Sequence, residues 1–239
     1  MINQFARTQL LLGESSMERL NNIRVAVFGV GGVGGYVCEA LVRSGVGAFD
    51  LIDNDKVCVT NLNRQIIATH KTIDQFKVDV MQERMHDINP EVQVRVHKCF
   101  VLPENIDEFP FAEYDYVVDA IDTVTAKIAL VVKCQNEGIP IISAMGAGNK
   151  IEASAFKVAD IYKTRMCPLA KVMRYELKKR GIKKLKVVYS KEKALAPVFS
   201  EGEERVPGST AFVPSVAGLI IASEVIKDLT GVRNDIVGA

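Results

Sequence analysis

The stretch from residue 25 to residue 35, VAVFGVGGVGG, decides the fold of this chain. It begins as a short apolar strand and runs directly into a turn with G-x-G-x-x-G spacing, formed by Gly29, Gly31 and Gly34. Glycine permits both a tight strand-to-helix turn and the close approach of a phosphate to backbone N–H groups. A helix over residues 32–44 would then point its N-terminus at the phosphates. The stretch therefore predicts a nucleotide-binding α/β fold.

The pattern around this stretch is that of a doubly wound sheet. Short apolar runs rich in β-branched residues alternate with helical patterns, as they do where a parallel sheet is buried on both faces. We expect strands at residues 25–28, 49–52, 92–96, 116–119, 139–144, 154–158 and 185–189. We expect helices at residues 3–20, 32–44, 72–87, 125–137, 168–179 and from residue 214 onward. The predicted fold class is α/β, a Rossmann-like and mostly parallel sheet flanked by helices.

The acids and cations that follow the glycine-rich turn indicate which nucleotide chemistry it serves. Asp53 ends the next strand, about 20 residues after the turn, where a carboxylate reaches a ribose hydroxyl. A dehydrogenase needs no fixed cations at its cofactor phosphates, whereas cleavage of ATP between the α- and β-phosphates builds negative charge on the leaving pyrophosphate. Arg64 and Lys77 are candidate cations for that charge, and Asp122 is a candidate Mg²⁺ ligand.

Each of these three residues also fits a structural role by itself. Arg64 fits a solvated loop, Lys77 fits a helix surface, and Asp122 fits the cap of the helix that follows it. As an ordered set after a nucleotide-binding turn, they favour a site that cleaves ATP.

Six short motifs, together with Lys77 between the fourth and the fifth, carry a resemblance to a known family. They are FARTQLLLG (5–13), GVGGVGG (29–35), LIDND (51–55), NLNRQ (61–65), DAID (119–122) and PGSTAFVPSVAGLIIASEVI (207–226). In this order they resemble the ThiF/MoeB family of adenylating enzymes, which are relatives of the ubiquitin-activating enzymes. The second half, through YKTRMCPLAKVMRYELKKRGI, resembles the branch of that family that dehydrates threonylcarbamoyladenosine in tRNA.

The resemblance implies a set of nucleotide contacts. They are Gly29, Gly31, Gly32, Gly34, Asp53, Asp55, Asn61, Arg64, Lys77 and Asp122. Asp53 would hold the ribose, with Asp55 close by. Asn61, Arg64 and Lys77 would line the channel for the triphosphate.

The resemblance also implies ATP and Mg²⁺ as cofactors, with the metal on Asp122. Arg7 matches an arginine that such enzymes insert from the partner subunit of a homodimer. Without the family, Arg7 would be an exposed arginine on an N-terminal helix. The implied catalytic residues are Arg7, Arg64, Lys77 and Asp122.

The reaction that the resemblance implies is the cyclisation of N6-threonylcarbamoyladenosine next to the anticodon of tRNA. The threonyl carboxylate would be adenylated, and AMP and pyrophosphate released. An accessory sulfurtransferase is a possible partner. Three alternatives remain: adenylation of the C-terminal glycine of a ubiquitin-like sulfur carrier, a nucleotide-binding module without chemistry, and an NAD oxidoreductase, in which NLNRQ has no role.

Charge is distributed unevenly along the chain, whose formal net charge is only +1. Residues 163–193 contain twelve lysines or arginines and two glutamates, so this segment carries +10 and the remainder carries −9. Such asymmetry suggests a site for a polyanion such as RNA, although a solvated, lysine-rich helix face gives the same pattern. The candidate RNA-binding residues are Lys171, Arg174, Lys178, Lys179, Arg180, Lys183 and Lys184. We expect one domain over residues 1–239, with an ATP-binding half at residues 1–150 and a substrate-binding, basic half at residues 151–239.

The cysteines indicate the cellular compartment and whether a structural zinc is expected. There are five, an odd number, without a C-x-x-C pair, which argues against a disulfide framework and for a reducing cytoplasm. Sulfur-relay members of the resembling family carry C-x-x-C pairs that hold zinc, so we expect no zinc here. Cys167 precedes a predicted helix and fits either a packed thiol or, as in relatives that transfer ubiquitin-like proteins, a catalytic one.

Two further expectations concern the membrane and the second half. No apolar run reaches the roughly 18 residues that a membrane span needs, so we expect no membrane partner. The polar connection over residues 190–210 is expected to move or become ordered when RNA binds.

Overall fold

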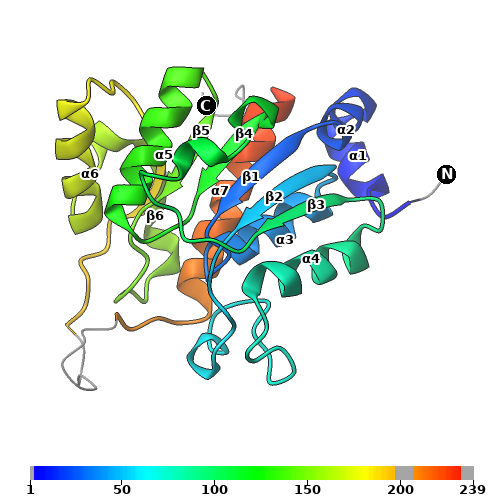
Figure 1. Cartoon of the computed structure of the whole chain (residues 1–239), viewed down its shortest axis with the longest axis horizontal. Helices are drawn as coiled ribbons and strands as arrows, with labels where there is room; N and C mark the ends of the chain where they lie inside the picture. Colours follow the sequence, from blue (N-terminus) through cyan, green and yellow to red (C-terminus); the bar gives the residue numbers. More distant parts are fainter. Residues whose placement is uncertain (1–2, 197–206, 233–239) are drawn as a thin grey trace.

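The computed structural model describes residues 3–196 and 207–232. Its centre is a seven-stranded sheet with the strand order β3-β2-β1-β4-β5-β7-β6 (Figure 1). The strands are β1 (Arg24–Phe28), β2 (Ala48–Ile52), β3 (Gln93–His97), β4 (Tyr116–Asp119), β5 (Ile141–Ala144), β6 (Phe156–Asp160) and β7 (Lys186–Ser190). Neighbouring strands are parallel except for β6, which pairs antiparallel with β7. The expected mostly parallel α/β sheet is confirmed.

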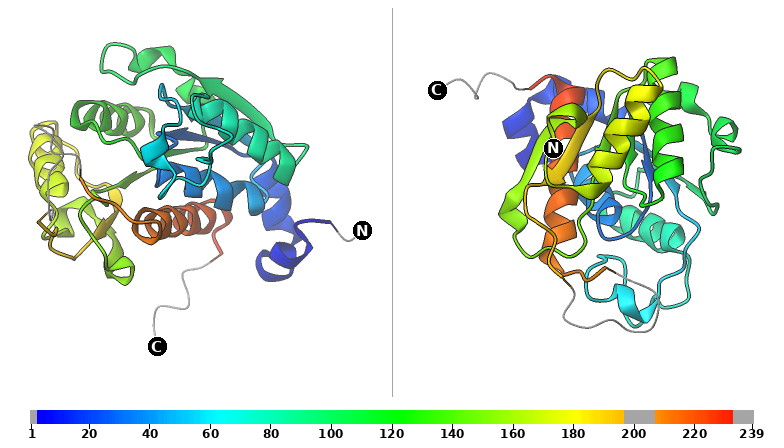
Figure 2. Two further views of the ribbon diagram at one scale, coloured as in Figure 1. Left: turned by 90° about the horizontal axis from the view of Figure 1, so that it is seen from below. Right: turned by 90° about the vertical axis from the view of Figure 1, so that its left-hand side faces the viewer.

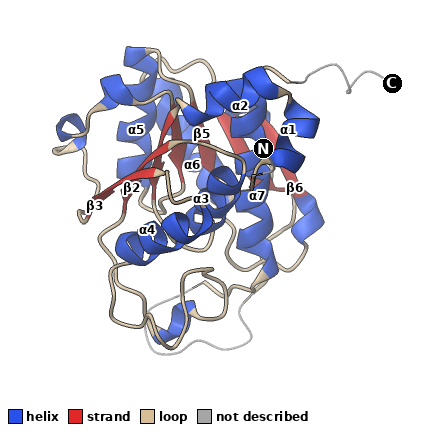
Figure 3. Cartoon of the chain, turned by 90° about the vertical axis from the view of Figure 1, so that its right-hand side faces the viewer, coloured by secondary structure: helices blue, strands red, loops and turns tan. Residues whose placement is uncertain are grey.

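Helices cover both faces of the sheet. They are α1 (Ala6–Leu12), α2 (Glu14–Asn21), α3 (Gly34–Arg43), α4 (Lys77–Ile88), α5 (Val124–Glu137), α6 (Pro168–Lys179) and α7 (Phe212–Thr230). One buried cluster joins the sheet to α3, α4 and α7, and a second cluster joins its other face to α5 and α6. Figures 2 and 3 show the sheet between these two helix layers.

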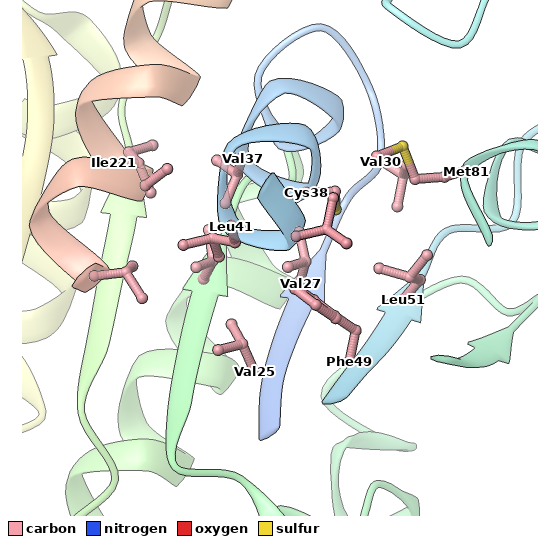
Figure 4. Close-up of a cluster of buried hydrophobic side chains, with 14 of the residues drawn as sticks. Val25, Val27, Val30, Val37, Cys38, Leu41, Phe49, Leu51, Met81 and Ile221 are labelled. Carbon is pink, nitrogen blue, oxygen red and sulfur yellow. The ribbon is translucent and has the colours of Figure 1, made fainter. Parts of the chain in front are cut away.

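The central strand β1 explains why the opening stretch decides the fold. Val25 and Val27 point into the cluster beneath α3, where they meet Phe49, Leu51 and Leu41 (Figure 4). Ala26 and Phe28, which alternate with them along β1, belong to the cluster on the opposite face. Because both faces of the strand are buried, its sequence is a continuous apolar run rather than an alternating one.

The parallel strands give the sheet two different edges. Their carboxyl ends meet at one edge, which we call the carboxyl edge and which faces down in Figure 1. Residues 53–76 and the start of α7 lie there. The opposite, amino edge carries α2, the end of α6 and the residues that lead from α6 into β7. Ligands of such sheets bind beyond the carboxyl ends of the strands.

Two helix boundaries differ from expectation for local reasons. The single helix expected over residues 3–20 is divided into α1 and α2 at Gly13. The positive φ of Gly13, 84°, is incompatible with a continuous helix. The helix expected from residue 72 begins at Lys77 instead. The Thr72 hydroxyl donates to Ile67 O at 2.8 Å, and Asp74 has a positive φ of 66°, so this segment forms a loop.

Two other expectations concern membrane-spanning helices and the connection over residues 190–210. None of the described helices is both long and apolar enough to cross a lipid bilayer. Residues 197–206 of the connection that was expected to respond to RNA lie outside the described residues, so that expectation stays a prediction.

Candidate active site

A cleft of about 490 Å³ opens at the carboxyl edge of the sheet. It is lined by all but one of the expected nucleotide contacts, namely Gly29, Gly31, Gly32, Asp53, Asp55, Asn61, Arg64, Lys77 and Asp122. These residues come from five separate segments of the chain. The fold therefore brings together at one site the residues that the sequence motifs singled out.

The four glycines of the turn serve two purposes. Gly29 has a φ of 89°, and a Cβ there would lie 2.7 Å from Ala120 O. A Cβ on Gly34, the one expected contact outside the cleft, would lie 1.8 Å from Gly29 O. Gly31 and Gly32 are less crowded, with side chains of Gln65 and Pro214 as their nearest neighbours at 3.8 and 3.3 Å. Gly29 and Gly34 let the backbone turn, and Gly31 and Gly32 leave room beside the cleft for a ligand.

Asp53 connects the end of β2 to the glycine-rich turn. Its Oδ2 accepts a hydrogen bond from the Val30 N–H at 2.7 Å, and its Oδ1 accepts one from the Asp55 N–H at 2.8 Å. Burial raises the pKa of Asp53, an effect that the nearby charge of Lys77 opposes. A half-buried carboxylate at this position can still accept from a ribose hydroxyl.

Lys77 is a buried cation, not a lysine on a helix surface. Its residue is only 6% exposed, and its ammonium group contacts Asp55 Oδ2 at 2.6 Å. The Lys77 N–H also donates to Asp55 O at 3.0 Å, which fixes the start of α4 against the end of β2. The side chain is therefore held in the cleft before any ligand arrives.

Arg64 is held by the turn in which it lies. Its Nη1 donates to Thr60 O and to Asn63 Oδ1, both at 2.8 Å. The buried side chain of Asn61 supports the same turn by accepting from the Cys58 N–H at 3.2 Å. Arg64 forms no ion pair with any residue that the structure describes. It is a positioned cation without a protein counter-ion, as a site for phosphate requires.

Asp122 does not cap the helix that follows it. The N-cap of α5 is Thr123, and Asp122 receives only a long 3.5 Å contact from the Thr123 hydroxyl. Its carboxylate is exposed in the cleft and has no ion-pair partner in the described ranges. Because Mg²⁺ is usually held by one or two carboxylates together with substrate phosphates, this donor fits the metal. The described residues contain no cluster of three or more histidine, cysteine or acidic side chains placed to hold a metal ion.

Sequence reasoning missed a buried ion pair beneath the cleft. Lys127 donates to Asp119 Oδ1 at 2.9 Å and to Ile121 O at 3.0 Å, and both charged side chains are 0% exposed. The pair fixes the loop that carries Asp122. A lysine in the mostly apolar first half of α5, after the acid-ended strand β4, is the sequence signal that could have revealed it.

Gln65 is a second residue that the sequence reading did not assign. It is the last residue of NLNRQ, lines the cleft and is buried. Its Oε1 has no hydrogen-bond partner among the described residues. An unsatisfied buried acceptor in a ligand cleft is the kind of atom that a bound ligand satisfies.

Arg7 lies away from the cleft of its own chain. It is exposed on α1, which packs beside Gly45 just before β2 and therefore at the amino edge. No residue of α1 is buried, and Leu10 and Leu11 are 89% and 81% exposed. Within one chain, Arg7 cannot join the other expected catalytic residues.

The seven candidate RNA-binding residues are not at the cleft either. Except for Arg174, which is half-buried, they are exposed on α6 or just after it. Arg174 contacts Thr164, while Lys179 and Arg180 contact Glu176. A helix of 12 residues is about 18 Å long, so the end of α6 lies well away from the carboxyl edge.

Cys167 occupies a packed position at the start of α6. It is buried, and its Sγ accepts from the Ala170 N–H at 3.5 Å as the N-cap of the helix. It does not line the cleft, although it lies near Gly146, just beyond β5. All five cysteines are free thiols. This position suits the interpretation of a packed thiol.

Comparisons with known proteins match nearly the whole chain. The ThiF family matches residues 4–238. A tRNA threonylcarbamoyladenosine dehydratase of Bacillus subtilis is 45% identical over 96% of this chain and 95% of the relative. The crystal structure of the Escherichia coli tRNA N6-threonylcarbamoyladenosine dehydratase with AMP aligns at 36% identity and a TM-score of 0.88, over 95% of this chain and 94% of that one. An adenylyltransferase and sulfurtransferase of Ogataea parapolymorpha is 31% identical over 63% of this chain but only 39% of the relative.

Proposed function

This chain belongs to the ThiF family, and on that premise we propose that it is an ATP-dependent enzyme that dehydrates N6-threonylcarbamoyladenosine in tRNA. The observation that carries the proposal is the cleft in which Arg64, Lys77 and Asp122 meet the glycine-rich turn. The bacterial relatives that match over the whole chain are named for this reaction, and the Escherichia coli relative has been crystallised with AMP and with ATP.

ATP would bind across the carboxyl edge, with its phosphates over the glycine-rich turn and the start of α3. Gly31 and Gly32 leave room there, and Asp53 would accept a hydrogen bond from the ribose. The buried Oε1 of Gln65 is available for a donor of the nucleotide. With these contacts, the α-phosphate would be open to a carboxylate that enters the cleft from solvent.

Adenylation is the first chemical step. The threonyl carboxylate oxygen of the modified adenosine attacks the α-phosphorus, and the bond to the β-phosphate oxygen breaks to release pyrophosphate. Negative charge grows on that leaving group, and Arg64 and Lys77 are fixed cations that stabilise it without reorganising. The ammonium group of Lys77 has three donors and uses one for Asp55, so it can also donate to a phosphate oxygen without giving up that contact.

Ring closure is the second step. The oxygen that the carboxylate gave to phosphorus leaves with AMP, while a neighbouring atom of the same carbamoyl-threonine attacks the activated carbonyl and loses its proton. The net change is the loss of one water from the nucleoside. Because nucleophile and carbonyl belong to one substituent, proximity supplies a large effective molarity.

Mg²⁺ is part of the proposal, with Asp122 as its protein ligand. When bound, the metal ion would supply positive charge at the triphosphate. The Lys127–Asp119 pair supports this carboxylate by bonding the backbone just before it. We do not expect zinc, and a metal assay that finds one equivalent of zinc per chain would contradict this part of the proposal.

The partners belong to the proposal as well. Arg7 and the exposed α1 face would complete the cleft of a second copy in a homodimer, because Arg7 cannot reach its own cleft. The seven basic residues of α6 and its following turn would bind the backbone of tRNA. A sulfurtransferase is a further expected partner. The cytoplasm is the expected location, since five free thiols suit a reducing compartment.

Activation of a ubiquitin-like sulfur carrier is the second candidate. The match to an adenylyltransferase and sulfurtransferase favours the same adenylation chemistry, but it covers well under half of that relative. Binding of a flexible, glycine-ended tail would also not require the net charge of +10 that residues 163–193 carry. Pyrophosphate exchange driven by a Gly-Gly-ended carrier would support this candidate.

Mass analysis of the nucleosides tests the proposed function directly. Bulk tRNA carrying the threonylcarbamoyl group is incubated with the protein and ATP, then digested. We expect the modified nucleoside to lose the mass of one water only when ATP and protein are both present. An unchanged nucleoside in the complete reaction would overturn the proposal.

A further inference from the structure

The basic segment of residues 163–193 is divided between the two edges of the sheet. The helix α6 starts near Gly146 at the carboxyl edge and ends at the amino edge, where Lys183 and Lys184 follow it. The strand β7 then returns the chain to the carboxyl edge (Figure 1). Lys191 and Lys193 come directly after β7. They are therefore lysines of this segment that lie at the same edge as the cleft.

A bonded turn presents these two lysines. The Glu192 N–H donates to the Ser190 hydroxyl at 3.1 Å, and the Lys191 N–H donates to Ala155 O at 3.1 Å. The buried Lys150 donates from its ammonium group to Glu192 O at 2.8 Å. The backbone on both sides of each lysine is thus fixed, although the lysine side chains themselves are exposed.

The one acid among residues 190–195, Glu192, is bonded to the backbone. The carboxylate of Glu192 accepts from the N–H groups of Ile151 and Glu152, both at 3.0 Å. The nearby Glu152 carboxylate is itself bonded to Ser154. Lys191 and Lys193 form no ion pair with any residue in the described ranges. The turn therefore exposes two positive charges while its own negative charge is bonded to the backbone.

The turn is attached to the wall of the cleft. The Leu195 N–H donates to Asn149 O at 2.8 Å, and Asn149 exchanges hydrogen bonds with Gly208. The adjacent Gly148 and Pro207 both line the cleft, and a Cβ on Gly148 would lie 2.8 Å from the Cβ of Pro207. A substrate group that enters the cleft along this wall must pass beside the turn.

We propose that the turn carrying Lys191 and Lys193 binds the phosphates of the anticodon loop that flank the target adenosine. The inference rests on the proposed function, because it assumes that the cleft receives a nucleoside of an RNA loop. Ile151 and Leu195, which are 59% and 53% exposed, lie beside the lysines. A single-stranded loop offers both phosphates for the lysines and unstacked bases for apolar side chains, which an acidic protein surface does not.

The test compares Lys191→Gln/Lys193→Gln with a matched control, Lys98→Gln/Lys133→Gln. The control removes the same charge from two lysines that do not line the cleft, Lys98 paired with Asp79 and Lys133 paired with Asp107. Binding is measured without ATP, by fluorescence anisotropy, for whole tRNA and for a synthetic anticodon stem-loop carrying the threonylcarbamoyl group. AMP formation is measured with both RNAs.

For the Lys191/Lys193 variant, we expect both RNAs to bind about tenfold more weakly, by the same factor. The slope of log Kd against log salt should fall by about 1.4, as for two single-strand phosphate contacts. KM for RNA should rise while kcat stays near that of the wild type, and the control should match the wild type. Unchanged binding of the stem-loop, whether or not whole tRNA binds more weakly, would overturn the inference. If the wild type binds RNA but forms no AMP with it, the proposed function fails, and the binding comparison still decides the role of the turn.

Discussion

The cations of the cleft and those of the amino edge are held in opposite ways. At the carboxyl edge, Lys77 is nearly buried against Asp55 and Arg64 is bonded to its own turn. At the amino edge, Lys183 and Lys184 are exposed and form no ion pair within the described part of the chain. Fixed charges stabilise a developing charge without reorganising, whereas mobile surface charges suffice to attract a polyanion. The difference is what we expect if the proposed chemistry takes place in the cleft and the amino edge contributes only to binding of the RNA.

The largest expected effect comes from removing a fixed cation at the carboxyl edge. Arg64→Ala should lower the rate of AMP formation by about 10²- to 10³-fold, because nothing else in its turn can neutralise the leaving pyrophosphate. The control is Arg95→Ala, which removes an exposed arginine paired with Glu113. If the Arg64→Ala protein formed AMP at the wild-type rate, the fixed cations of the cleft would not be needed for the chemistry.

The next largest effect is expected on folding stability, when a glycine is replaced by alanine at each of the two edges. Gly29 and Gly181 both have positive φ, but only Gly29 is packed against Ala120. Gly181→Ala should cost about 1 kcal/mol of folding free energy from its left-handed conformation. Gly29→Ala adds the clash with Ala120 O and should cost about 3 kcal/mol. Urea unfolding of both variants measures the difference, and equal costs would show that the turn at Gly29 can relax.

A smaller effect is expected from the amino edge. Lys183→Gln/Lys184→Gln should weaken the binding of whole tRNA by about tenfold and reduce its salt dependence, since two phosphate contacts are lost. The rate of AMP formation at saturating tRNA should not change. Filter binding at several salt concentrations measures the affinity for tRNA and its salt dependence. Single-turnover kinetics measure the rate of AMP formation. A fall in the saturated rate would mean that this edge takes part in the chemistry.

The smallest effect is expected at Cys167. This thiol is buried, caps α6 and does not line the cleft, and the proposed dehydration forms no thioester. Cys167→Ser should therefore retain nearly full turnover in the AMP assay. Loss of turnover in a variant with an unchanged unfolding curve would assign Cys167 to catalysis.

The sequence predicted the carboxyl edge well because its signals are local. The glycines, Asp53 and Asp122 each follow directly from the end of a strand, and parallel strands place such residues together. Most of the expected strands lie within two residues of the observed ones. The course of residues 57–76 could not be predicted in the same way, because it depends on pairing between its two ends, where the Val57 N–H donates to Gln75 O and the Asp74 N–H donates to Val57 O.

Other features depend on contacts between distant segments. The antiparallel direction of β6 and its place beside β7 have no local signal. The charge of residues 163–193 identified a basic segment but not that β7 divides it between two edges. The Lys127–Asp119 pair was missed because the burial of Lys127 depends on the strand that this lysine faces.

AMP release from labelled ATP tests most directly the claim that the cleft adenylates a tRNA nucleoside. Three additions are compared: tRNA carrying the threonylcarbamoyl group, tRNA lacking it, and a Gly-Gly-ended carrier protein. We predict AMP only with the modified tRNA, and its loss in the Asp122→Ala variant. AMP formed only with the carrier protein would contradict the claim and make the basic segment a surface for a protein partner.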